Sequence, residues 1–566
     1  MTIASLPTAG RRYGLALAFA AAALLAACTI DNQDKAGSSA GSGSTAATAK
    51  AAPGVVAPGA QLNMRAVPAG SAQSLSVTYP PQSERYPSFA ENTWQQVTEA
   101  PLSTIAMEVD TAAYSRLRRM ISDGFLPPRD ALRIEEMVNY FEYAYADPAD
   151  PAKPFAISAN VLPSPWNSET RLLHVGIKAW EPLRAAERPA ANLVLLVDIS
   201  GSMKANDRLP LVKRALKLLV GQLRPQDHAA LVVYAGTAQV VLEPLPGSGR
   251  NRLQSEIERL SAGGSTAGGA GLALAYRLAE QHFDPAGVNR ILLFSDGDFN
   301  VGPSDSGAIG ELIATKRTSG VYLSVFTVGT GNLNDRIAQS LAQQGNGIAA
   351  YLDGLGEARR LFEDQLAATL TPIADDVKAQ IEFNPQQVAE YRLIGYETRR
   401  LAYRDFTDDR VDAGEVGSGH SVTLLYEFRP LGAAPPPRSL RYQSAAAKAK
   451  PPSRPANIDN DVAREFAHLT IRYKLPGQQR AREISRPITF ADAHANLEAT
   501  PREARFAAAV AAFGLALRGT PDLGGFSLDQ VARLADGARG PDPRGERAEF
   551  LRLVRDAESL QKTSGN

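Results

Sequence analysis

The stretch that decides the fold is LVLLVDISGSM, from Leu193 to Met203. Its first half is a run of apolar residues typical of a buried strand. The run ends abruptly in a carboxylate, Asp198, which two hydroxyl residues, Ser200 and Ser202, follow at alternate positions. This spacing lets a tight loop turn three oxygen-bearing side chains toward one point. The stretch therefore predicts a core strand with a polar cluster at its carboxyl end.

The chain around this stretch alternates buried strands with amphipathic helices from residue 189 to residue 371. That order predicts an α/β fold, a doubly wound and mostly parallel sheet with helices on both faces. Sites in such folds lie at the carboxyl ends of the strands. The expected strands include Asn192–Val197, Ala229–Tyr234, Arg290–Phe294 and Tyr322–Val328, and the expected helices include Leu209–Gln222, Gly269–Gln281 and Asp335–Gln343.

Two further polar positions fall on the same predicted edge of the sheet. GGSTAGGAG, from Gly263 to Gly271, sets Thr266 at the start of a helix, and LLFSDGD sets Asp296 at the end of a central strand. Carboxylate and hydroxyl oxygens without His or Cys suit a hard cation, Mg²⁺ or else Mn²⁺ or Ca²⁺. The sequence thus predicts a metal site at this edge. Its expected ligands are Asp198, Ser200, Ser202, Thr266 and Asp296.

These residues resemble the von Willebrand factor type A (VWA) domain and its metal-ion-dependent adhesion site, Asp-x-Ser-x-Ser with a distant Thr and Asp. The resemblance implies that the two Ser hydroxyls bind the metal directly, and that Thr266 and the aspartates bind it directly or through water. It also implies one open position for a carboxylate of a ligand. Only two protein carboxylates approach the ion, which favours binding of an Asp or Glu over catalysis.

Other interpretations of these residues are weaker. The hydroxyls and carboxylates could merely cap helices and turns. A phosphate-binding loop would need a lysine that the glycine-rich stretch lacks. A haloacid-dehalogenase-type phosphotransferase would carry a second aspartate where Ser200 stands. Asp298 is either a further acceptor near the metal or, as we favour, a turn residue.

The flanking segments also resemble known sequence. PLSTIAMEVDTAAYSRLRRMI, LPPRDALRIEEMVNYF and GERAEFLRLV are similar to segments of a bacterial lipoprotein family that combines a VWA domain with a C-terminal domain of unknown function. Strand-rich stretches lie on both sides of the α/β region, at Phe155–Trp180 and at 375–475. We expect them to pair in one sandwich-like, β-rich domain into which the VWA domain is inserted, with the two ends of the insertion close together. Asp110 and Asp130, which precede helices, are expected as N-caps.

The predicted domain organisation follows from these patterns. It comprises a lipoprotein signal peptide (1–27), a flexible tether (28–90), an N-terminal α/β segment (91–150), strands that pair with the C-terminal domain (151–188), the VWA domain (189–371), a β-rich domain (372–490) and a helical C-terminal segment (491–566). A Pro- and Ala-rich mobile loop is expected at 433–460 within the β-rich domain.

The N-terminus predicts export and lipidation. Arg11 and Arg12 precede a short apolar run, Leu15–Ala27, and then the single cysteine, Cys28. This order resembles the bacterial lipoprotein signal, in which the cysteine is diacylated and becomes the mature N-terminus; a plain signal peptide or a short membrane helix is the alternative. Thr29, rather than an aspartate, follows the cysteine, so by enteric-type sorting we expect anchoring in the outer membrane. No disulfide is possible.

Composition excludes other classes of function. Lys plus Arg equals Asp plus Glu at 60 each, so the chain has no net positive charge that would attract nucleic acid. The six histidines show neither metal spacing nor a triad, and no small-molecule substrate is evident. We therefore expect a non-enzymatic, lipid-anchored envelope protein that binds a protein partner through an acidic residue. The alternatives are a scaffold with a structural metal and a metal-dependent hydrolase.

Overall fold

The computed structural model describes residues 84–107, 110–150, 152–181, 188–298, 302–411, 413–433 and 462–564. The predicted signal peptide, Cys28, most of the predicted tether and almost all of the Pro- and Ala-rich loop lie outside these residues. Among the described helices, none is both long enough and apolar enough to cross a membrane.

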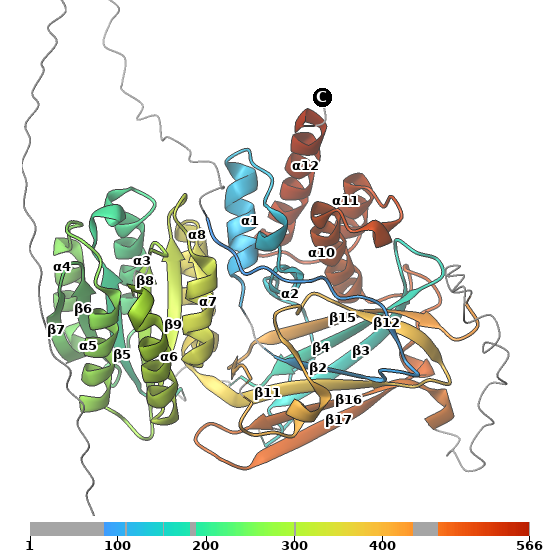
Figure 1. Cartoon of the computed structure of the whole chain (residues 1–566), viewed down its shortest axis with the longest axis horizontal. Helices are drawn as coiled ribbons and strands as arrows, with labels where there is room; N and C mark the ends of the chain where they lie inside the picture. Colours follow the sequence, from blue (N-terminus) through green and yellow to red (C-terminus); the bar gives the residue numbers. More distant parts are fainter. Residues whose placement is uncertain are drawn as a thin grey trace, which may run out of the picture. The chain divides into compact units, whose positions relative to one another are not determined.

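A six-stranded sheet forms the centre of the α/β domain, which spans residues 189–371 (Figure 1, green to yellow). All neighbouring strands are parallel except the edge pair β6 and β7. The strand order is β10 (Ala349–Leu352), β9 (Val321–Val328), β8 (Val288–Ser295), β5 (Ala191–Asp198), β6 (His228–Tyr234) and β7 (Ala238–Pro246). Its helices are α3 (Leu209–Gly221), α4 (Arg250–Arg259), α5 (Gly268–Gln281), α6 (Gly302–Thr318), α7 (Asp335–Gln344), α8 (Leu355–Arg359), η6 (Arg360–Asp364) and α9 (Leu366–Leu370).

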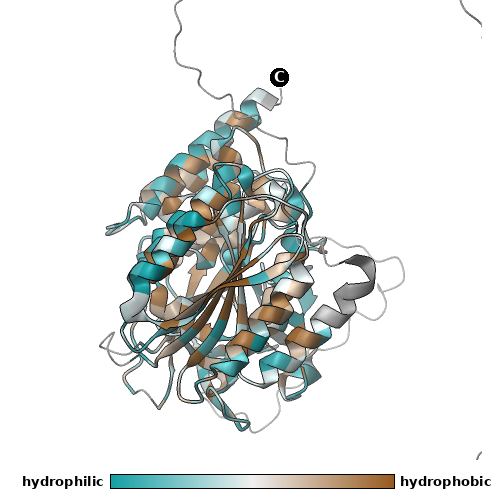
Figure 2. Ribbon diagram, turned by 90° about the vertical axis from the view of Figure 1, so that its left-hand side faces the viewer, coloured by the Kyte–Doolittle hydropathy of each residue, from teal (hydrophilic) through white to brown (hydrophobic). Residues whose placement is uncertain are grey.

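Strand β5 shows why the sheet is doubly wound. All eight of its residues are buried. Leu193, Leu195 and Val197 pack in the core on one face, and Val194 and Leu196 pack in the core on the other. Alternation with period two thus places apolar side chains on both faces, and each face needs a layer of helices. Figure 2 shows apolar strands flanked by helices with mixed faces. The predicted fold class is confirmed.

Two antiparallel sheets pack face to face as a sandwich around a shared apolar core. One sheet has the order β1 (Gln95–Gln96), β12 (Val388–Ile394), β15 (Ser421–Pro430), β4 (Arg171–Ala179) and β3 (Phe155–Pro163). The other has the order β13 (Arg400–Leu401), β2 (Leu102–Ala106), β11 (Pro372–Phe383), β16 (Glu465–Lys474) and β17 (Ala481–Thr489), with β14 (Val416–Gly417) beside β11.

The α/β domain is inserted into this sandwich. Strand β4 precedes the α/β domain in the chain, and its residues Arg171 to Lys178 pair with β15, which follows that domain. The chain leaves the sandwich at Trp180 and returns at Thr371. The carbonyl oxygens of these two residues accept hydrogen bonds from the neighbouring N–H groups of Gly419 and Ser418, at 3.1 and 2.9 Å. The two ends of the insertion therefore lie side by side.

The N-terminal segment is not a separate unit. Its strands β1 and β2 belong to the sandwich, and its helices α1 (Ala112–Ser122) and α2 (Ile134–Asn139) share one apolar core with the C-terminal helices. These are α10 (Arg502–Arg518), α11 (Leu528–Asp536) and α12 (Glu546–Ser564). We call the sandwich and these helices together the body. Glu84, which lies inside the range expected as tether, pairs with the buried Arg116.

Both capping predictions are wrong. Asp130 lies inside the short helix η2 (Arg129–Ala131), whose N-cap residue is Pro128. Thr111, not Asp110, is the N-cap residue of α1. The carboxylate of Asp110 instead accepts the N–H of Ala349 at 2.7 Å and pairs with Arg399 at 3.1 Å. A buried acceptor from the body thus binds the start of β10, a contact between distant segments that a local pattern does not reveal.

Candidate functional site

The predicted ligands lie at the carboxyl edge of the parallel sheet. Asp198 is the last residue of β5, and Ser200 and Ser202 lie in the loop that follows and in its short helix η4 (Gly201–Lys204). Asp296 directly follows β8, which pairs with β5. Thr266 lies two residues before α5. The topology therefore brings the five predicted residues to the same edge of the sheet.

Asp198 orders the loop that carries the two serines. Its Oδ1 accepts the N–H of Ser200 at 2.8 Å, and its Oδ2 accepts the hydroxyl of Ser295 at 3.2 Å. The hydroxyl oxygens of Ser200 and Ser202 are 3.1 Å apart. Burial raises the pKa of the Asp198 carboxyl above its ordinary value, while the Ser200 N–H lowers it and the Asp296 carboxylate raises it further. Three oxygen-bearing groups thus form one compact cluster.

Backbone hydrogen bonds tie the loop of Thr266 to this cluster. The N–H of Gly263 donates to the carbonyl of Ile199 at 2.8 Å, and the N–H of Gly201 donates to the carbonyl of Gly264 at 2.9 Å. Gly264 has a φ of +90°, which favours glycine there. Thr266 is half-buried, and its hydroxyl makes no hydrogen bond to any residue that the structure describes. This hydroxyl is available to a ligand.

Asp296 is held by residues that the sequence did not single out. Its Oδ2 accepts a hydrogen bond from Arg208 Nη1 at 2.7 Å and from Asn332 Nδ2 at 2.9 Å. Its Oδ1 accepts the N–H of Asp298 at 3.2 Å, and the Asp298 side chain is exposed, as expected of a turn residue. Neither Arg208 nor Asn332 belongs to a spacing motif, so no signal in the sequence would have found them.

The donor set fits a hard divalent cation. Two carboxylates and three hydroxyls are the oxygen ligands that Mg²⁺ binds, and they leave room for water or an incoming ligand. No described part of the chain holds a group of three or more His, Cys, Asp or Glu side chains suited to a metal. The hydroxyls would add to the two carboxylates at this edge. The described hydrogen bonds of Asp198, Ser200 and Asp296 include no histidine that could serve as a base.

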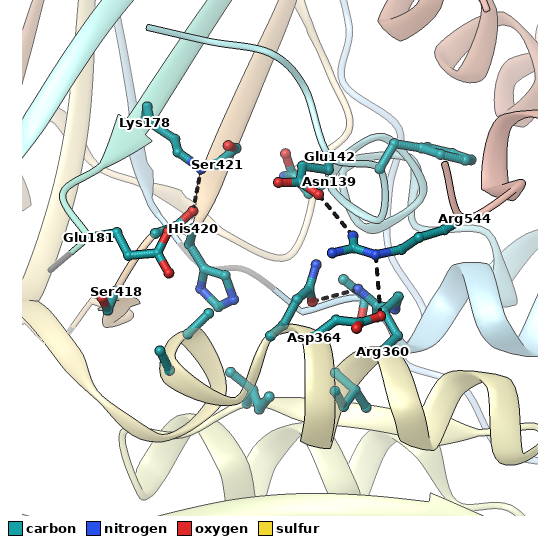
Figure 3. Close-up of a pocket in the computed structure, with 18 residues that line it drawn as sticks. Asn139, Glu142, Lys178, Glu181, Arg360, Asp364, Ser418, His420, Ser421 and Arg544 are labelled. Atoms are coloured by element: carbon teal, nitrogen blue, oxygen red, sulfur yellow. Dashed lines mark hydrogen bonds and ion pairs between the residues drawn. The ribbon is translucent and has the colours of Figure 1, made fainter. Parts of the chain in front are cut away.

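A separate pocket lies where the α/β domain meets the body (Figure 3). Its volume is about 90 Å³, and its wall includes Ile348, which precedes β10. It therefore opens at the amino edge of the sheet, opposite the metal ligands. Arg544 in its wall pairs with Glu142 at 2.8 Å and with Asp364 at 3.2 Å. Lys178 Nζ donates to the carbonyl of Gly419 at 2.6 Å, and Arg360 pairs with Glu357. The wall carries three acidic and three basic side chains, so the pocket has no excess charge to select a ligand.

Three family models match this chain. The model described as von Willebrand factor type A domain matches residues 193–298, which contain all five candidate ligands. The model described as von Willebrand factor matches residues 80–174. The model described as Uncharacterized protein YfbK, C-terminal, matches residues 368–560, which form most of the sandwich and the terminal helices.

Solved structures and a curated relative are also similar to this chain. Among solved structures, a von Willebrand factor type A protein from Catenulispora acidiphila is 16% identical and covers 73% of this chain and 91% of its own, with a TM-score of 0.41. The ArnB paralog VWA2 from Sulfolobus acidocaldarius is 13% identical and covers 72% and 98%, with a TM-score of 0.36. Uncharacterized protein YfbK of Escherichia coli is 42% identical over 490 residues, which are 86% of this chain and 83% of the relative. The chain therefore belongs to the YfbK family of proteins, which join a von Willebrand factor type A domain to a C-terminal YfbK domain.

Proposed function

We propose that this protein is anchored in the cell envelope by a lipid and binds a protein partner through a divalent metal at Asp198, Ser200, Ser202, Thr266 and Asp296. The observation that supports the metal most is the cluster of oxygens at the end of β5 and β8. When bound, the metal supplies a Lewis acid with an open position. Asp198 and Asp296 would hold the ion with two negative charges, and the hydroxyls of Ser200, Ser202 and Thr266 would complete the protein ligands.

The partner that fits this site presents an acidic side chain. The two carboxylates cancel the formal charge of a divalent ion, and the remaining ligands are hydroxyls, which carry no charge. An incoming Asp or Glu therefore gains a strong, charge-assisted contact with the ion. A protein with such a residue on a protruding loop is the expected ligand.

The test is a cross-linked pull-down from native envelope, with Mg²⁺ and with chelator. We expect partners that appear with the full-length protein only when Mg²⁺ is present. Asp198→Ala should lose the same partners, and Mg²⁺ should not restore them. Asp298→Ala is the matched control, because its exposed carboxylate lies two residues from Asp296 and accepts no described hydrogen bond.

Thermal melting with and without Mg²⁺, combined with the pull-down, separates the alternatives. A scaffold with a structural metal would melt at a higher temperature with Mg²⁺ but keep its partners after chelation. A metal-dependent hydrolase would need a base beside the ion, and the described contacts of the site offer none. Retention of all partners by Asp198→Ala and in chelator would refute the adhesion proposal.

Anchoring rests on the sequence around Cys28. We expect the wild-type protein to sediment with outer-membrane markers, and Cys28→Ser to leave the membrane fraction. Sedimentation of the wild type wholly with inner-membrane markers would contradict the predicted address.

A further inference from the structure

Arg208 places a fixed positive charge at the candidate metal site. It directly precedes α3, and its side chain is 13% exposed. Nη1 donates to Asp296 Oδ2 at 2.7 Å and to the carbonyl of Ser202 at 2.8 Å. An arginine is always protonated in a protein, so this cation competes with a metal ion for the same carboxylate.

The loop at 329–334, which follows β9, holds Arg208 in this position. Arg208 Nη2 donates to the carbonyl of Thr330 at 2.9 Å and to Asn332 Oδ1 at 2.7 Å. Gly329 has a φ of +80°, and a Cβ there would lie 2.5 Å from Arg208 Nε. Only glycine lets this loop close over the guanidinium. The position of Arg208 thus depends on the position of the loop.

The N-terminal strap, Glu84–Arg85, holds this loop from the other side. Glu84 Oε1 accepts the N–H of Gly331 at 3.0 Å, and the N–H of Arg85 donates to the carbonyl of Leu333 at 2.9 Å. The Glu84 side chain has no exposed surface and pairs with Arg116 of α1. These contacts flank Asn332, the residue that bonds both Arg208 and Asp296.

We propose that the N-terminal strap is a latch that keeps Arg208 on Asp296 and so lowers the affinity of the site for metal. The proposal rests on the proposed metal-dependent function and adds a means of regulating it. Release of the strap frees the 329–334 loop, lets Arg208 leave Asp296 and strengthens metal binding. The strap is where the described chain joins residues 1–83, which the sequence assigns to the anchor and tether.

Calorimetric titration of the full-length protein with Mg²⁺ tests this coupling. We expect Arg208→Gln to tighten Mg²⁺ binding about fivefold or more, within the range common for coupled sites. Glu84→Ala should tighten it by a smaller factor, because it only loosens the loop. In the Arg208→Gln background, Glu84→Ala should have no further effect, since the strap acts through Arg208.

Control variants show whether a change in Mg²⁺ affinity comes from a general loss of structure. Glu397→Ala removes a carboxylate from another buried ion pair of the body, with Arg518, and should leave Mg²⁺ affinity unchanged. Glu84→Gln keeps the size of the side chain but removes its charge, and serves if Glu84→Ala does not fold. Thermal melting identifies variants that have lost their structure.

The outcomes separate the latch from the proposed function. Wild-type binding of Mg²⁺ with unchanged or weaker binding by Arg208→Gln overturns the latch alone. So does an additive effect of Glu84→Ala in the Arg208→Gln background. Failure of both the wild type and Arg208→Gln to bind Mg²⁺ overturns the metal site itself, and the latch with it. Binding that appears only in Arg208→Gln supports a strong latch.

Discussion

The α/β domain and the body are built in opposite ways along the chain. The α/β domain is continuous, and its core strands pair in parallel with strands from the same 189–371 stretch. The body is assembled from both sides of that insertion: β2 pairs with β11, and β4 with β15. The α/β domain, which is continuous in the chain, carries the candidate site. The body, which is discontinuous, depends on contacts that join distant segments.

Buried ion pairs make several of these long-range contacts. Arg133, at the start of α2, pairs with Asp335 of α7 at 2.7 Å, and its side chain is 2% exposed. Arg290 of β8 pairs with Glu415 of the body at 2.9 Å. Removal of one partner leaves the other charge buried and uncompensated, so these pairs fix how the domain and body fit together.

The largest expected effect comes from breaking one of these pairs. Arg133→Ala should lower the free energy of unfolding by about 3–5 kcal/mol, because Glu136 and Asp335 would remain buried without their cation. Urea unfolding measures it. Trp94, Trp166 and Trp180 all lie in the body, so their fluorescence reports the body, while circular dichroism reports the whole chain. The two signals should separate in this variant.

The control for this prediction is an exposed pair. Arg533→Ala removes the partner of Asp529 on α11, where both side chains are more than half exposed, and should cost less than about 1 kcal/mol. A cost for Arg133→Ala no larger than that of Arg533→Ala would show that the junction does not hold the two units together.

A smaller effect should appear in how the stability of the body depends on pH below neutrality. Burial lowers the pKa of His174 to about 3 from its ordinary 6.5. The unfolded chain therefore binds a proton that the folded chain does not. The contribution of the neutral His174 imidazole to the free energy of unfolding is complete above pH 6.5. It is lost as the pH falls from 6.5 toward 3. His174→Gln should reduce the slope of stability against pH by about 1.4 kcal/mol per pH unit between pH 6 and 4.

Urea unfolding followed by tryptophan fluorescence at several pH values checks this slope. His228→Gln, at an exposed position of β6 in the α/β domain, should leave it unchanged. An equal slope for the wild type and His174→Gln would mean that the imidazole is not kept neutral by burial. His420 also has its pKa lowered to about 3, mainly by burial, so a residual slope is expected in both proteins.

The smallest effect on stability is expected at the metal edge. Thr266→Ala removes one half-buried hydroxyl with no described partner, and should cost less than about 1 kcal/mol without metal. The same variant should lose metal-dependent partners in the pull-down. A large loss of stability in metal-free thermal melts would assign Thr266 to the fold rather than to ligand binding.

The sequence predicted the continuous unit better than the discontinuous one, for physical reasons. The period of two in Leu193–Val197 and the polar residues after it are local signals, and the structure places them at one edge as expected. The pairing of Asp110 with Arg399, and the role of Glu84, depend on segments far apart in the chain. Local patterns indicate a cap or a tether at such positions, and tertiary contacts override them.

The same limit applies within the candidate site. Asp198, Ser200 and Asp296 follow buried strands, so the edge they share was predictable from strand order. Arg208 and Asn332 reach Asp296 only because the 329–334 loop folds back over the start of α3. That closure is set by the loop and by the N-terminal strap, which no spacing rule connects to the metal ligands.

The most direct test of the account is calorimetric titration of Mg²⁺ into the wild type, Asp198→Ala and Asp298→Ala. We expect binding at a single site in the wild type and in Asp298→Ala, and an affinity lower by on the order of tenfold or more in Asp198→Ala. Binding of Mg²⁺ to Asp198→Ala with the wild-type affinity, or no binding to either the wild type or Arg208→Gln, would contradict the claim that the carboxyl edge of this sheet is a metal site.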